Sequence, residues 1–282
     1  MTLRAPLFLL LPAMAVVVLL FGGGLLMAFL QSLGYIPAIG RTELSLDAYR
    51  RLVGDPAFGR SLGLSLWIAA VSSAVSVLLA VGGALALRRP WRGQKATTFI
   101  FQLPIPIPHL VGAIGVLFLL GQSGLLARLA FGLGLIQTPA EFPALIYDRY
   151  GLGIILTYVW KSAPFIGLIL LAVLRGLGDE YEEAARTLGA NRWQRFRYVI
   201  LPFLMPGILS SSILVFAFTF GAFEVPLLLG QRFPSMLPVL AYRYYTDVDL
   251  NNRVEAMAMS VIMAVIITAV ILVYVRLASR RG

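Results

Sequence analysis

Six long apolar stretches dominate this sequence, and each is long enough to cross a membrane as a helix. A helix needs about 20 mostly apolar residues to span about 30 Å of hydrocarbon. Backbone groups in lipid must bond within their own segment, and barrel strands would be shorter and alternating, so the stretches predict helices. We therefore expect an all-α, polytopic membrane protein with six transmembrane helices. The stretches are residues 7–30, 62–87, 98–120, 151–174, 203–223 and 256–275.

The composition also indicates that lipid is the main solvent. The 282 residues are 59% hydrophobic and only 13% charged, whereas soluble domains carry about 25% charged residues. Without cysteine and with a single histidine, the chain offers neither a disulfide framework nor a Cys/His zinc site. We predict no metal and no cofactor. The first stretch is too long for a typical signal peptide, and no convincing cleavage site follows it, so we expect an uncleaved helix.

The distribution of positive charge predicts the orientation in the membrane. Lys and Arg gather in alternate loops, at 88–95, 175–197 and 276–281, whereas the loops on the other side are nearly neutral. Positive loops mark the cytoplasmic side, so we expect both termini in the cytoplasm. Anionic headgroups and cytoplasmic partners account for the net charge of +10, and no nucleic-acid partner is expected.

The segment 175–202, between the fourth and fifth stretches, is predicted to form a charged elbow of two short helices. Its acidic residues lie early, as suits the N-terminus of a helix. Glu182 and Arg186 stand four positions apart, which is the spacing of ion pairs on a helix. The small and apolar residues expected to share one face of this helix are Ala184, Ala185 and Leu188.

The end of the first elbow helix and the start of the second have recognisable signals. Gly189 fits a left-handed helix stop, because glycine takes that conformation without steric cost. Asn191 followed by Gln194 resembles a capping box that opens a second short helix at 192–198.

The elbow also carries a spaced motif, E-A-A-x3-G-x9-I-x-L-P, with valine in place of isoleucine. This motif resembles the signature of inner-membrane permease subunits of binding-protein-dependent ABC importers of the type I fold. The run 218–230 is similar to the corresponding segment of the polyamine, thiamine and ferric-iron branch of that family. The residues that match the motif are Glu183, Ala184, Ala185, Gly189, Val199, Leu201 and Pro202.

The resemblance implies a function and a set of partners. The elbow would be the coupling helix, with Glu183, Ala184, Ala185 and Gly189 contacting a cytoplasmic ATPase, and with Leu201 and Pro202 fixing the elbow to the fifth span. Residues 61–282 would form the five-helix permease core, and residues 1–60 an added helix and external loop. The partners would be a second permease subunit, identical or homologous, two ATPase subunits and an extracytoplasmic solute-binding protein. Transport would proceed by alternating access.

The sequence lacks the groups that would make the chain an enzyme. It has no G-x-x-x-x-G-K-[ST] loop, so another chain would have to bind and hydrolyse ATP. It also has no H-E-x-x-H motif and no Ser/His/Asp set for hydrolysis. The alternative to an importer subunit is a secondary transporter or channel that works alone.

Prolines interrupt the third stretch. Pro104, Pro106 and Pro108 forbid a regular helix through 103–108. Non-helical backbone at membrane depth is tolerated only inside protein or beside a cavity, so this segment is expected to face other helices or a path. His109, which follows, is expected to be a capping or interfacial group in preference to a proton relay.

Two ionisable residues and two hydroxyl residues are candidates for the substrate path. Lys161 lies near the middle of the fourth stretch, where a charge needs a partner or water. Glu224 follows Gly221 and precedes Pro226. It either has a structural role, as a pair with Lys161 or solvated at the membrane interface, or faces a cationic organic solute such as a polyamine in the outer vestibule. Ser211 and Thr219 either line the path or pack between helices.

Overall fold

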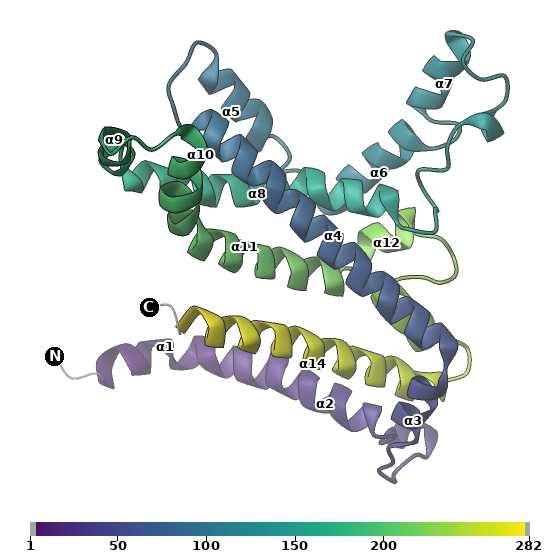
Figure 1. Cartoon of the computed structure of the whole chain (residues 1–282). Coiled ribbons are helices and arrows are strands. Elements are labelled where there is room, and N and C mark those ends of the chain that lie inside the picture. The colour runs from purple at the N-terminus through teal and green to yellow at the C-terminus, as the bar shows by residue number, and fades with distance from the viewer. Residues whose placement is uncertain (1–3, 280–282) are drawn as a thin grey trace. The chain divides into compact units, whose positions relative to one another are not determined.

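The computed structural model describes residues 4–279, and these residues form helices joined by loops, without a β-strand (Figure 1). Residues 1–3 and 280–282, the outer ends of the two predicted domains, lie outside the described residues. By length and composition, six helical segments can cross a membrane, which confirms the predicted number. They are Leu10–Ser32, Pro56–Leu87, His109–Gly132, Leu152–Leu177, Arg192–Gly221 and Asn252–Arg276.

The third of these segments differs most from the prediction. We expected it at 98–120, but the chain forms α5 (Gln94–Gln102), a non-helical turn, α6 (His109–Leu120) and α7 (Leu125–Gly132). The predicted break at 103–108 is confirmed, because three prolines without N–H groups fall in this turn. The apolar run at 98–102 therefore belongs to a separate short helix, and the predicted start of the span is wrong.

The chain divides into two compact units. The first consists of Met1–Gly59 and Leu237–Ile266, the second of Arg60–Met236 and Ile267–Gly282. In the first unit, Arg51 of α3 donates to Glu255 of α14 at 2.7 Å, and the hydroxyls of Ser32 and Tyr49 lie 2.7 Å apart. Its helices are α1 (Arg4–Val17), α2 (Gly23–Ser32), α3 (Asp47–Gly54), α13 (Leu237–Tyr245) and most of α14 (Asn252–Ser279).

The second unit is built around α8 (Leu152–Leu177), which packs along α11 (Leu201–Gly221) (Figure 1). Ile166, Leu170 and Leu204 are fully buried between these helices. At Gly167 a Cβ atom would lie 2.7 Å from the ring of Phe101, so glycine allows α5 to approach α8 closely. Its other helices are most of α4 (Pro56–Leu87), α6, α7, α9 (Glu180–Thr187), α10 (Arg192–Arg195) and α12 (Glu224–Leu229).

Candidate functional site

The elbow begins with α9 and ends in a left-handed glycine, as its sequence predicts. Gly189 has a φ of +84°. Its N–H donates to Arg186 at 3.0 Å, and the N–H of Ala190 donates to Ala185 at 3.0 Å, which closes the end of the helix. A Cβ atom at Gly189 would meet no other atom within 4 Å. Glycine is therefore required here by the backbone conformation and not by lack of space.

The second part of the elbow starts with the predicted capping box but does not end where predicted. Asn191 accepts from the N–H of Gln194 at 2.9 Å, and Gln194 accepts from the N–H of Asn191 at 2.8 Å. We expected a separate helix that ends at 198. Instead α10 passes through a π-helical turn, Phe196–Ile200, directly into α11.

The motif residues of α9 are uncovered in this chain. Glu183 and Ala184 are exposed, and Ala185 is partly exposed. Leu188, which follows on the expected apolar face, is 88% exposed. An exposed leucine beside small residues on a short charged helix is a surface that a partner protein can cover.

Glu182, next to the motif, is buried within a cluster of three arginines. Both guanidinium Nη atoms of Arg88 bond to its carboxylate, one of them at 3.0 Å. Arg89 donates at 3.5 Å, and Arg195 lies 3.9 Å away. The expected pair with Arg186 is wrong: α9 turns Glu182 inward, and Arg186 is exposed.

Lys161 is held by the broken third span and not by a carboxylate. Its ammonium group donates to the backbone oxygen of Pro104 at 2.6 Å, to that of Ile105 at 3.2 Å, and also to that of Ile107. The oxygen of Pro104 has no helical donor four residues on, because that position is Pro108. Lys161 therefore bonds to three backbone oxygens of the proline-containing turn, and one of them, that of Pro104, also accepts from the N–H of Ile107 at 3.3 Å.

The predicted alternative of a Lys161–Glu224 pair is wrong for the described residues, because Lys161 makes no ion pair there. Glu224 is the first residue of α12, and its side chain is exposed.

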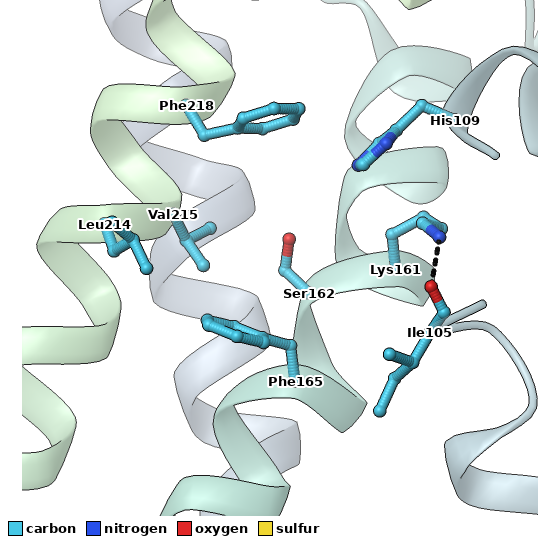
Figure 2. A pocket seen from close by; sticks show the side chains of 8 residues that line it. All are labelled: Ile105, His109, Lys161, Ser162, Phe165, Leu214, Val215 and Phe218. Carbon is cyan, nitrogen blue, oxygen red and sulfur yellow. Dashed lines mark hydrogen bonds between the residues drawn. The ribbon is translucent and has the colours of Figure 1, made fainter. Parts of the chain in front are cut away.

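A cavity of about 350 Å³ opens beside Lys161, between α6, α8 and α11 (Figure 2). The rings of His109 and Phe218 face each other with their centroids 4.8 Å apart, and the hydroxyl of Ser162 points into the space between the helices. His109 forms no side-chain cap, so the predicted capping role is wrong, and its ring packs against aromatic residues instead. The lining residues are Ile105, His109, Lys161, Ser162, Phe165, Leu214, Val215 and Phe218.

Of the four residues predicted for the substrate path, only Lys161 lines this cavity. Ser211 is buried and bonds to the backbone oxygen of Gly207 in its own helix at 2.6 Å. Thr219 is buried, and its hydroxyl has no hydrogen-bond partner within residues 4–279. Sequence reasoning missed Phe218 and Leu214, although their spacing of four residues places them on one face of α11.

Residues 76–281 match the family model of the binding-protein-dependent transport system inner membrane component, and this match identifies the family. This chain belongs to that family. It is a permease subunit of an ABC importer. The matched region contains the elbow, Lys161 and the cavity of this permease, whereas the first span lies outside the match.

Relatives and a solved structure agree with the assignment. The permease is 32% identical over 241 residues to the inner membrane ABC transporter permease protein YcjO of Escherichia coli, covering 84% of this chain and 80% of the relative. It is 31% identical over 229 residues to the molybdenum transport system permease protein ModB of Mycobacterium tuberculosis, covering 78% and 80%.

The fold matches a crystal structure of a bacterial alginate ABC transporter in complex with an alginate pentasaccharide-bound periplasmic protein. The TM-score is 0.79 at 22% sequence identity, over 97% of the permease and 94% of that chain. This likeness confirms the type I importer permease fold that the elbow motif implies.

Proposed function

We propose that this permease forms one side of a solute path through the membrane and that α9 couples it to a separate ATPase. The observation that carries the proposal is the uncovered elbow. There Gly189 ends α9 in the left-handed conformation, and Glu183, Ala184 and Leu188 remain exposed. Such a tip is suited to a groove on a partner, and nothing else in the described residues covers it.

The motif residues have two roles in this proposal. Glu183, Ala184, Ala185 and Gly189 contact the ATPase. Leu201 and Pro202 join the elbow to α11, which is supported by the unbroken run from α10 through the π-helical turn into α11. A displacement of the elbow would therefore be passed to a helix that lines the cavity.

The remaining parts of the proposal follow from the positive loops and the family. The termini and the elbow face the cytoplasm from an inner membrane, and residues 61–282 form the permease core. A second permease subunit completes the path, two ATPase subunits bind the elbows, and an extracytoplasmic binding protein delivers the solute. The periplasmic protein in the alginate transporter structure supports the last of these partners.

Two observations support different chemical classes of solute. A cationic organic solute such as a polyamine is supported by Glu224, which is exposed at the start of α12. The cavity supports a neutral or anionic solute, because Lys161 is among the residues that line it and no Asp or Glu is. Lys161 belongs to the proposed path because it lines the cavity, whereas Ser211 and Thr219, which are buried and do not line it, stay expectations from the sequence.

The coupling role is tested with the purified transporter in lipid vesicles. We expect Glu183→Lys and Gly189→Asp to leave membrane insertion intact and to abolish uptake and solute-stimulated ATP hydrolysis, whereas Glu180→Lys, on the same helix, keeps both. Normal uptake in the first two variants would contradict the proposal. Uptake by the wild-type chain without ATP or an ATPase subunit would support the stand-alone transporter instead.

The solute class is tested with Glu224→Lys and the matched variant Glu224→Gln. If the solute is cationic, the reversed charge lowers uptake more than the neutral amide does, because the repulsion adds to the lost attraction. Equal uptake by both variants and the wild type would remove Glu224 from the path.

A further inference from the structure

One carboxylate, that of Glu182, joins three separate segments of the second unit. Glu182 lies on α9, Arg88 and Arg89 follow directly after the end of α4, and Arg195 ends α10. Glu182 is only 4% exposed. A carboxylate so deeply buried is stable only when charged donors surround it, and here they come from segments on either side of α9.

Glu182 and Glu183 are neighbours with opposite surroundings. Successive residues on a helix point about 100° apart, so when Glu182 turns inward to the arginines, Glu183 turns outward to the solvent. The motif side of α9 is thus left free for a partner, whereas the Glu182 side is attached to the rest of the permease.

We propose that Glu182 is a positioning residue that fastens the coupling helix to the end of α4. This inference rests on the proposed coupling role of α9. When the ATPase displaces α9, the Glu182–Arg88 contact carries α4 with it, in addition to α8 and α11, which the chain itself connects to the elbow.

The geometry of the contact supports a mechanical role. Arg88 binds through both Nη atoms, and such a two-point contact fixes orientation as well as distance. α9 has only eight residues, and a helix of this length is marginal without tertiary contacts. The end of α4 has no covalent link to α9 nearby in sequence, because Arg88 and Glu182 are 94 residues apart. The ion cluster is therefore a direct connection between them.

The first experiment separates attachment from ATPase contact. In the reconstituted transporter, we expect Glu182→Gln to retain the ATPase subunits and basal ATP hydrolysis but to lower uptake and solute-stimulated hydrolysis about 10-fold. The matched control is Glu180→Gln, which removes an exposed carboxylate from the same helix and should change neither. If Glu182→Gln loses the ATPase subunits, Glu182 belongs to the ATPase contact and the proposal is overturned.

The second experiment replaces the ion cluster with a covalent link. The chain has no cysteine, so Arg88→Cys/Glu182→Cys can be joined by a short bis-methanethiosulfonate cross-linker without background reaction in the permease itself. We expect the double variant to be uncoupled, the cross-linked form to recover most solute-stimulated hydrolysis, and reduction to remove it again. Failure of the cross-link to restore coupling, or normal coupling without it, would overturn the proposal.

A failure of the proposed function would look different. In that case the wild-type permease itself would bind no ATPase subunit and would give no solute-stimulated hydrolysis. A wild type that couples normally, together with a Glu182→Gln variant that also couples normally, would reject the role of Glu182 alone.

Discussion

The second unit buries two charges of opposite sign and satisfies them in opposite ways. Lys161, in the most buried of the six spans, bonds to three backbone oxygens of a proline-broken turn. Glu182, on the elbow, bonds to arginine side chains from two other segments. Inside a span, where every added charge is costly, an irregular backbone supplies the partners; at the end of the helices, charged side chains supply them.

This difference between the two sites determines how much stability a mutation at each of them should cost. The backbone oxygens around Lys161 cannot be removed by mutation, so the loss of the ammonium group takes a charged donor from all three of them at once. The partners of Glu182 are several and partly exposed, so the loss of one arginine leaves others nearby. The contrast predicts that stability falls by decreasing amounts in three variants, which are Lys161→Met, Arg88→Met and Arg89→Met.

The largest effect is expected for Lys161→Met, which keeps the length of the side chain and removes its donors. We expect the free energy of unfolding to fall by about 3 kcal/mol, because buried carbonyls lose charged donors. Thermal unfolding of the purified permease in detergent measures this loss. The matched control is Lys95→Met, since Lys95 is exposed. Equal stability of the two variants would show that the turn does not depend on Lys161.

A smaller loss is expected for Arg88→Met, about 2 kcal/mol, because a largely buried carboxylate loses its two-point partner but keeps Arg195 within 3.9 Å. The same unfolding measurement applies. The double variant Arg88→Met/Glu182→Met should regain stability relative to Arg88→Met alone, since it leaves no unpaired buried carboxylate. Additive losses would mean that the two side chains are not energetically coupled.

The smallest effect is expected for Arg89→Met. Arg89 contacts the same carboxylate, but its side chain is 65% exposed, and such pairs contribute less than about 1 kcal/mol. We expect its unfolding temperature in detergent to lie close to that of the wild type and well above that of Arg88→Met. An unfolding temperature as low as that of Arg88→Met would show that the two arginines contribute equally to stability. It would contradict the expectation that the more buried arginine contributes more.

Features that depend on nearby residues could be predicted from the sequence. The six spans follow from apolar length, the left-handed stop from Gly189, the capping box from Asn191 and Gln194, and the broken turn from its prolines. Each of these depends on groups within a few residues of one another, so local stereochemistry determines them.

Features that depend on distant residues could not be predicted. The partner of Glu182 lies 94 residues away, and that of Lys161 is 57 residues away and is a backbone oxygen. A pattern of side-chain types does not reveal which backbone oxygens a buried ammonium group reaches, so the sequence leaves Glu224 as one alternative partner of Lys161. The cavity was missed for the same reason, because it forms only where three helices meet. The roles of the elbow residues stay predictions.

The exposure of Leu188 affects how this permease behaves when no partner protein covers the elbow. Burying one leucine side chain contributes about 2 kcal/mol, which is about a 30-fold gain in affinity for whatever surface covers it. A subunit synthesised in excess keeps this leucine in water, where another copy of the chain or a detergent micelle competes to cover it. Under the proposed coupling role, synthesis of the permease together with its ATPase subunit would protect it from self-association.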